Sequence, residues 1–239
     1  MIPKVIHYCW FGKSPLPKDV KKCIKSWKKY CPDYEIIEWN EENFNINCNN
    51  FTKEAYRKRA WAFVSDYARL KVVYDNGGIY LDTDVELLKG IDSLLESKCF
   101  FATQAEPQKI ATGLGFGAEK KHYIIKNMMD MYENLEFSYE KKENFICPQL
   151  NTEPLIEKGY VPSNDIQKLD DVVIYPPRYF DPINSSGFNI TYDTISIHHY
   201  SASWENGFYR IKRKFAAILG PSMEGKIKKI RSKIKPNID

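Results

Sequence analysis

The sequence of 239 residues lacks long hydrophobic runs, paired cysteines and a histidine cluster. Nowhere do 18 apolar residues follow one another, so we expect neither a membrane-spanning helix nor a secretory leader. The six Cys form no Cys-x-x-Cys pair and show no zinc-ligand spacing with the four His, which favours reduced, scattered thiols. What remains is an ordinary globular composition, 43% apolar and 28% charged, in a chain long enough to bury a core without crosslinks.

The formal charge of +4 is unevenly distributed along the chain. Residues 208–235 hold ten Lys or Arg and one acid, Glu224, a net of +9, whereas the remainder holds 25 basic and 30 acidic residues, a net of −5. Apolar residues such as Phe215 and Ile218 recur among these charges at helical spacing. The pattern predicts one domain over 1–207 and a basic amphipathic tail over 208–239.

The tail has three interpretations. An interfacial helix on anionic lipid is favoured, because basic charge alternates with apolar residues there. A solvated helix that covers one edge of the fold is the structural alternative. Nucleic-acid binding is disfavoured, because no aromatic stacking platform or reader motif accompanies the charge.

Strand and helix patterns alternate over the first 90 residues. Expected strands at Val5–Phe11, Tyr34–Trp39 and Ile79–Leu81 are separated by helical patterns at 17–31 and 52–76. This alternation predicts an α/β domain with a mixed, mainly parallel sheet. Ligands of such sheets bind at the carboxyl ends of the strands. Beyond residue 98 the pattern weakens, with strands expected at 99–103, 172–175 and 194–199 and a helix at 120–135.

Two pairs of charged residues surround the third expected strand. Asp66 and Arg69 are three apart, so a helix places them on one face, where the plain alternative is a solvated ion pair. Asp82 and Asp84 follow the strand, and in an extended segment they point the same way, roughly 6.5 Å apart. Their repulsion favours a hard divalent cation, Mn²⁺ or Mg²⁺, that could also hold a diphosphate.

Four ordered motifs resemble glycosyltransferase family 32 and its DXD sugar-binding region. They are I-P-K-V-I-H-Y-C-W-F-G at Ile2–Gly12, S-W-K-K-Y-C-P-D-Y-E-I-I-E-W-N at Ser26–Asn40, S-D-Y-A-R followed by G-G-I-Y-L-D-T-D-V within Arg59–Val85, and H-H-Y-S-A-S-W at His198–Trp204. The clostridial glucosylating toxins are distantly similar in their S-D-x-x-R and D-x-D residues. Residues 100–190 match no motif. The resemblance implies a GT-A-like fold, a nucleotide-sugar donor and transfer with retention of configuration.

The resemblance also implies roles for individual residues. Trp10 would stack on the nucleobase, and Ile6 and His7 would line the same pocket, although His7 on a buried strand also suits a core position. Asp66, Arg69 and Asp82 would act on the donor sugar, with Tyr80 among the donor-binding residues. Asp84 would be the principal metal ligand, with Asp82.

The late motif supplies further candidates. Alternation along an expected strand directs only one of His198 and His199 toward the crevice, and His199 is preferred as a third metal ligand. Ser203 and Trp204 resemble residues that close over the leaving group, with core packing as the alternative for Trp204. The glycine-rich loop at 112–117 lacks the Lys-Ser/Thr of a P-loop and is interpreted as a mobile loop on the acceptor side.

These observations predict a cytoplasmic, peripherally membrane-associated hexosyltransferase. It would move a sugar from a nucleotide-diphosphate sugar, UDP-linked, to a saccharide or lipid-linked oligosaccharide in surface or capsular polysaccharide synthesis, without a nucleic-acid partner. The alternatives are a haloacid-dehalogenase-like phosphohydrolase with Asp82 as nucleophile, and a non-catalytic module that binds membranes or polyanions. The phosphohydrolase is disfavoured because its motif belongs on the first strand, whereas two strands precede Asp82 here.

Overall fold

The computed structural model describes residues 1–140, 145–184 and 187–200. Residues 1–199 form one compact unit. The expected tail over 208–239, the domain boundary at 207 and the candidate residues Ser203 and Trp204 lie outside the described residues. Within the described part, no helix is both long and apolar enough to cross a bilayer.

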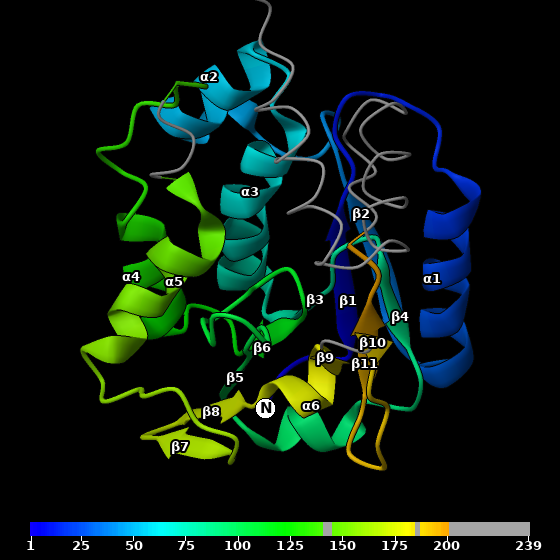
Figure 1. Ribbon diagram of the computed structural model, residues 1–239. Helices are drawn as coiled ribbons and strands as arrows, with labels where there is room; N and C mark the ends of the chain where they lie inside the picture. The colour runs from blue at the N-terminus through cyan, green and yellow to red at the C-terminus, as the bar shows by residue number, and fades with distance from the viewer. Residues whose placement is uncertain (141–144, 185–186, 201–239) are drawn as a thin grey trace, which may run out of the picture. The chain divides into compact units, whose positions relative to one another are not determined.

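A seven-stranded mixed sheet forms the centre of the described part (Figure 1), in the order β2-β1-β3-β6-β5-β8-β7. Neighbouring strands are parallel in β1–β2, β1–β3 and β5–β8 and antiparallel in β3–β6, β5–β6 and β7–β8. Two small sheets, β4–β11 and β9–β10, lie beside it. The strands are β1 Val5–Cys9, β2 Glu35–Trp39, β3 Gly78–Tyr80, β4 Val85–Leu87, β5 Cys99–Ala102, β6 Phe116–Ala118, β7 Gln167–Leu169, β8 Val172–Tyr175, β9 Ile183–Asn184, β10 Gly187–Phe188 and β11 Ser196–His198.

Helices cover the sheet from two sides. In Figure 1, α2 to α5 gather on one side and α1 lies on the other. α3 packs on β1, β3 and β6, and α2 and α4 pack against α3. On the other side, α1 packs on β4. Trp27 of α1 is fully buried and its indole N–H donates to the carbonyl of Val85 at 2.8 Å. The helices are α1 Lys18–Tyr30, α2 Asn50–Arg57, α3 Trp61–Asn76, α4 Tyr123–Asp130, α5 Cys147–Ile156 and α6 Pro177–Phe180.

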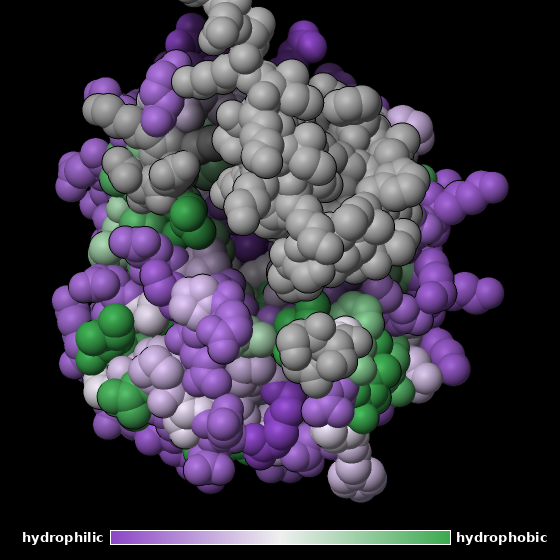
Figure 2. Space-filling view, in the orientation of Figure 1, coloured by the Kyte–Doolittle hydropathy of each residue, from purple (hydrophilic) through white to green (hydrophobic). Residues whose placement is uncertain are grey.

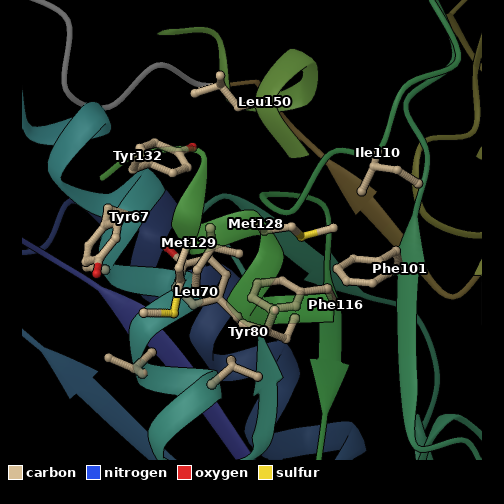
Figure 3. Close-up of a cluster of buried hydrophobic side chains, with 14 of the residues drawn as sticks. Tyr67, Leu70, Tyr80, Phe101, Ile110, Phe116, Met128, Met129, Tyr132 and Leu150 are labelled. Atoms are coloured by element: carbon tan, nitrogen blue, oxygen red, sulfur yellow. The ribbon is translucent and has the colours of Figure 1, made fainter. Parts of the chain in front are cut away.

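The core between the sheet and α3 is rich in aromatic and sulfur-containing side chains (Figure 3). Tyr67 and Leu70 of α3 lie there with Met128 of α4 and Phe116 of β6. Phe116 stacks on Phe101 of β5 with ring centroids 5.8 Å apart. Each fully buried side chain of this size contributes about 1.5–3 kcal/mol relative to exposure, so the core fixes α3 firmly against the sheet.

The connection from α3 to β3 depends on two glycines. Gly77 and Gly78 both have positive φ, 72° and 100°, a conformation that residues with a Cβ adopt rarely. A Cβ on Gly78 would also lie 2.8 Å from His7 Nε2. Only glycines allow α3 to end and β3 to begin within two residues, directly beside β1.

The sequence patterns locate most elements of the first 90 residues. The expected helical stretch over 52–76 consists of two helices, α2 and α3. Beyond residue 98, β8 coincides with its expected range, and α4 is shorter than the expected helix at 120–135. The sheet is mixed as expected, but its parallel strands are interrupted by β6, which forms because the chain after β5 folds back antiparallel.

Candidate active site

The candidate site lies where β1 and β3 end. These strands are parallel neighbours, and the amide of Leu81 donates to the carbonyl of His7 at 3.1 Å. Their carboxyl ends therefore meet at one edge of the sheet, as the sequence predicted. Trp10 follows β1 at this edge, and Asp82 follows β3.

Asp82 and Asp84 converge through a turn rather than along an extended strand. The amide of Val85 donates to the carbonyl of Asp82 at 3.0 Å, which closes the turn before β4 begins. β4 then pairs antiparallel with β11, with Val85 opposite His198. The pairing brings His198 Nε2 to 2.9 Å from Asp84 Oδ1.

Among the described residues, Asp82, Asp84 and His198 form a candidate metal centre. Each offers one ligand atom, and these atoms lie within 4.8 Å of one another. Two carboxylates and an imidazole suit Mn²⁺, and the carboxylates also suit Mg²⁺. Burial alone would lower the pKa of His198, but Asp84 and the more distant Asp82 outweigh burial and raise it. The histidine therefore sits in a negative field that a bound cation would neutralise.

The preference for His199 as the metal ligand needs correction. His199 Nε2 lies 2.8 Å from Glu86 Oε2, away from the Asp82–Asp84 cluster, whereas His198 contacts Asp84. Alternation along β11 directs only one of the two rings toward the cluster, as expected. The register between β11 and β4 decides which one, and no sequence pattern specifies that register.

A buried arginine connects α3 to the Asp82 side of the site. Arg69 Nη2 lies 3.0 Å from Asp66 Oδ1 and 3.2 Å from Asp82 Oδ1, so the predicted Asp66–Arg69 face is confirmed. The guanidinium also lies over the Tyr80 ring, 5.1 Å from its centroid, and the Tyr80 hydroxyl donates to Asp82 Oδ1 at 2.9 Å. Arg69 thus fixes the positions of two carboxylates at once.

Opposing effects act on the pKa of the Asp66 carboxyl. Burial raises the pKa of its carboxyl to about 6, although Arg69 opposes the increase and Asp82 adds to it. For Arg69, burial alone would lower the pKa, but Asp82, Tyr80 and Asp66 raise it well above its usual value. The arginine is therefore permanently charged, and Asp66 is a carboxylate near neutral pH that a further negative charge nearby would help to protonate.

Sequence patterns did not identify the residues of α5 that lie beside Arg69. Cys147 begins α5, and its Sγ lies 3.7 Å from Arg69 Nη1 and 3.1 Å from both Thr112 Oγ1 and Asn151 Nδ2. Asn151 is fully buried, and its Oδ1 has no hydrogen-bond partner among the described residues. Residues 100–190 matched no motif, so only the packing of α5 reveals them.

The glycine-rich loop at 112–117 also belongs to the site. The amide of Asp82 donates to the carbonyl of Gly113 at 3.1 Å, and a Cβ on Gly113 would lie 2.2 Å from Asp82 Oδ2. Thr112 and Phe116 are buried on either side. The loop is thus packed directly against Asp82, and its predicted mobility and acceptor-side role stay predictions.

The predicted residues of β1 differ in their surroundings. Trp10 is partly exposed, and its indole N–H donates to the carbonyl of Ser14 at 2.6 Å. His7 is fully buried, accepts from the Trp39 indole at 3.0 Å and has its Nε2 2.8 Å from the carbonyl of Gly77. Both ring nitrogens are thus engaged, which makes His7 a core residue and not part of an open pocket. Ile6 is likewise fully buried.

A groove of about 680 Å³ opens beyond the end of β1. Ser14 lines the groove, and its carbonyl accepts the hydrogen bond from the Trp10 indole. The amide of Gly12, also in the groove wall, donates to Glu41 Oε1 at 2.7 Å. The groove combines aromatic and basic side chains, lined by Gly12, Lys13, Ser14, Glu41, Tyr56, Arg57, Arg59 and Trp61.

Comparison with known proteins identifies this arrangement. Residues 17–101, which include α3, β3 and both aspartates, match the glycosyltransferase sugar-binding region containing a DXD motif. This part of the chain therefore resembles the sugar-binding region of glycosyltransferases that contain a DXD motif. Over 217 residues the chain is 27% identical to an uncharacterized glycosyltransferase of Acanthamoeba polyphaga mimivirus, a match that covers 85% of this chain and 84% of the relative.

Two further likenesses bear on fold and relatives. The chain is 29% identical over 135 residues to inositol phosphoceramide mannosyltransferase 1 of Schizosaccharomyces pombe, covering 52% of this chain and 40% of that protein. The match thus spans less than two thirds of the relative's length. The PaToxG glycosyltransferase superposes with a TM-score of 0.52 at 18% identity, over 65% of this chain and 69% of that chain. This likeness is one of fold, and the fold is GT-A.

Proposed function

We propose that this protein is a metal-dependent, retaining glycosyltransferase that uses a nucleoside diphosphate sugar and a saccharide acceptor. The observation that carries the proposal is the convergence of Asp82, Asp84 and His198 at the edge where β1 and β3 end. A carboxylate cluster at this edge, beside a buried arginine, is suited to a cation and a diphosphate.

The proposed chemistry requires control of charge on both sides of the bond that breaks. A divalent cation held by Asp82, Asp84 and His198 would stabilise the negative charge that develops on the departing diphosphate. Asp66 would act on the sugar side of the bond, since a negatively charged carboxylate near the anomeric carbon stabilises the positive charge that develops there. Arg69 holds Asp66 and Asp82 in fixed positions and keeps a rigid fork of donors in the site.

The donor is proposed to be UDP-linked, with its base on Trp10 beside the groove described above. The mannosyltransferases among the relatives suggest a mannosyl donor as the alternative. The acceptor is proposed to be a lipid-linked oligosaccharide in surface polysaccharide synthesis, with the enzyme at the cytoplasmic face of a membrane. The expected tail would contribute to that attachment, and the inositol phosphoceramide mannosyltransferases, by their names, offer a parallel for a lipid acceptor.

The position of Asp82 argues against the phosphohydrolase alternative. The nucleophilic aspartate of that class follows the first strand of its domain. Asp82 instead follows β3, after both β1 and β2. A non-catalytic module would leave the buried Asp66–Arg69–Asp82 arrangement without a task.

Donor binding tests the proposal directly. Titration calorimetry with UDP-glucose, UDP-galactose and GDP-mannose, with and without Mn²⁺, should show metal-dependent binding of at least one donor. Asp84→Asn should abolish that metal dependence and the slow hydrolysis of the donor. Absence of binding by all three sugars, together with hydrolysis of a simple phosphoester, would instead support the phosphohydrolase.

A further inference from the structure

Helix α1 presents an unusually basic face. All six of its lysines are exposed, whereas Val20, Cys23 and Trp27 form its buried face. Its sequence contains one acidic residue, Asp19. Figure 2 shows hydrophilic side chains standing out along the right-hand edge, where Figure 1 places α1. The lysines are Lys18, Lys21, Lys22, Lys25, Lys28 and Lys29.

The second feature is an uncharged segment that carries several exposed apolar side chains. Residues 182–192 include no charged residue, in a chain that is 28% charged. Ile183 and Phe188 are opposite one another in the β9–β10 pair, so their side chains share a face. They are 40% and 47% exposed, and Ile190 and Tyr192 beyond them are 55% and 96% exposed. A soluble surface rarely gathers this many large apolar side chains without a function.

A chain of contacts joins the two features. Lys22 Nζ lies 3.2 Å from Glu86 Oε2, the same oxygen that lies 2.8 Å from His199 Nε2. The Phe188 ring meets the His199 ring edge-on, with centroids 6.2 Å apart. At the far end of the segment, Lys89, which follows β4 and does not belong to α1, lies 5.2 Å from the Tyr192 ring centroid. α1 packs on β4, and β4 pairs with β11, so these two strands lie between α1 and the β9–β10 pair (Figure 1). Figure 2 shows hydrophobic residues at the lower right.

We infer that the lysine face of α1 and the apolar residues Ile183, Phe188, Ile190 and Tyr192 together bind an anionic lipid bilayer. This α1–β10 surface belongs to the catalytic body and is distinct from the tail. Each lysine near an anionic leaflet contributes about 1 kcal/mol, and aromatic and aliphatic side chains enter the boundary between headgroups and acyl chains. Charge and apolar area therefore reinforce each other on one partner.

Other partners fit this surface less well. A second copy of the chain would place two lysine faces against each other, which is unfavourable. A nucleic acid would use the lysines, but aliphatic side chains such as Ile183 and Ile190 gain nothing from phosphates. A bilayer uses both parts of the surface.

The position of the surface matters for the reaction. His199 and Glu86 lie within it, and their chain neighbours His198 and Val85 pair at the edge of the candidate metal centre. A bilayer bound there would bring lipid headgroups close to the site. This consequence rests on the proposed function, whereas the binding itself does not.

Vesicle sedimentation of the full chain tests the inference. Phosphatidylcholine vesicles would be compared with vesicles containing one third phosphatidylglycerol. Lys21→Gln/Lys25→Gln/Lys28→Gln should weaken binding to anionic vesicles about 100-fold, and Phe188→Ser/Ile190→Ser should weaken it roughly 10-fold or more. Matched controls are Lys53→Gln/Lys120→Gln/Lys168→Gln and Val161→Ser/Ile166→Ser, which change exposed residues elsewhere and should bind as the wild type does.

Two outcomes would overturn the inference. One is failure of the wild type to bind anionic vesicles, and the other is equal loss of binding in test and control variants. Donor hydrolysis in lipid-free solution should be unchanged in all four variants, so a failed membrane test is distinguishable from a failed function. As a second measurement, Phe188→Trp should add fluorescence that acyl-brominated lipids quench, and Ile166→Trp should not. Equal quenching of the two would also contradict the inference.

Discussion

Asp84 and His198 lie 2.9 Å apart although 114 positions separate them in the chain. The contact exists because β4, directly after the D-x-D turn, pairs antiparallel with β11 and sets His198 opposite Val85. Neither strand belongs to the central sheet. The two-stranded β4–β11 sheet therefore completes a cluster whose carboxylates come from the end of β3.

The first prediction separates the two histidines. His198→Gln should reduce Mn²⁺ affinity by roughly 10-fold or more, because an imidazole ligand beside Asp84 is lost. His199→Gln should change the affinity little, because His199 contacts Glu86 instead. Calorimetric titration of Mn²⁺ into each variant measures the difference. Equal losses, or a larger loss in the His199 variant, would contradict the assignment.

The second prediction concerns the charge of Arg69. Arg69→Met should destabilise the fold by up to about 3–5 kcal/mol, because it leaves the partly buried Asp66 and Asp82 without their countercharge. Arg69→Lys keeps the charge but loses the fork, so its stability loss should be smaller while activity still falls. Urea unfolding and donor hydrolysis check both parts. A stable, inactive methionine variant would show that the carboxylates do not depend on Arg69.

The third prediction concerns the loop against Asp82. Gly113→Ala should displace the Asp82 carboxylate, because the added Cβ would lie 2.2 Å from Oδ2. Donor binding should then weaken by roughly 10-fold or more, since both Arg69 and the metal centre use Asp82. Gly90→Ala is the matched control, because its Cβ would meet its nearest neighbour at an ordinary 3.4 Å. Unaltered donor affinity in Gly113→Ala would argue that the loop moves freely.

The fourth prediction is a pH dependence that originates in His7. Burial lowers the pKa of His7, although the contact with Gly77 partly opposes it. As pH falls below about 6.5, the unfolded chain takes up a proton that the folded chain refuses, so stability decreases, by at most about 1.4 kcal/mol per pH unit from this group. His7→Gln should therefore show a weaker loss of stability between pH 7.5 and 5 in urea unfolding. An identical slope in wild type and variant would exclude His7 as the source.

Local sequence patterns located much of the site on α3 and β3. The three-residue spacing of Asp66 and Arg69 implies one helical face, and the apolar run before Asp82 implies a buried strand with its ligand end at Asp82. Local sequence patterns could not place Cys147 or Asn151, because these two residues come from a helix without a recognisable motif. They also could not exclude His7 from the pocket, because both of its hydrogen bonds go to residues distant in the chain.

The sequence by itself determined the α/β order, the DXD pair and the division between an acidic body and a basic tail, because periodicity and charge are local properties. Tertiary structure decided the rest of the site. Strand register chose His198 over His199, helix packing brought Cys147 to Arg69, and contacts through Glu86 and His199 linked Lys22 of α1 to Phe188 of β10. Each of these depends on pairing between distant segments, which buries surface and satisfies backbone hydrogen bonds only in the complete fold.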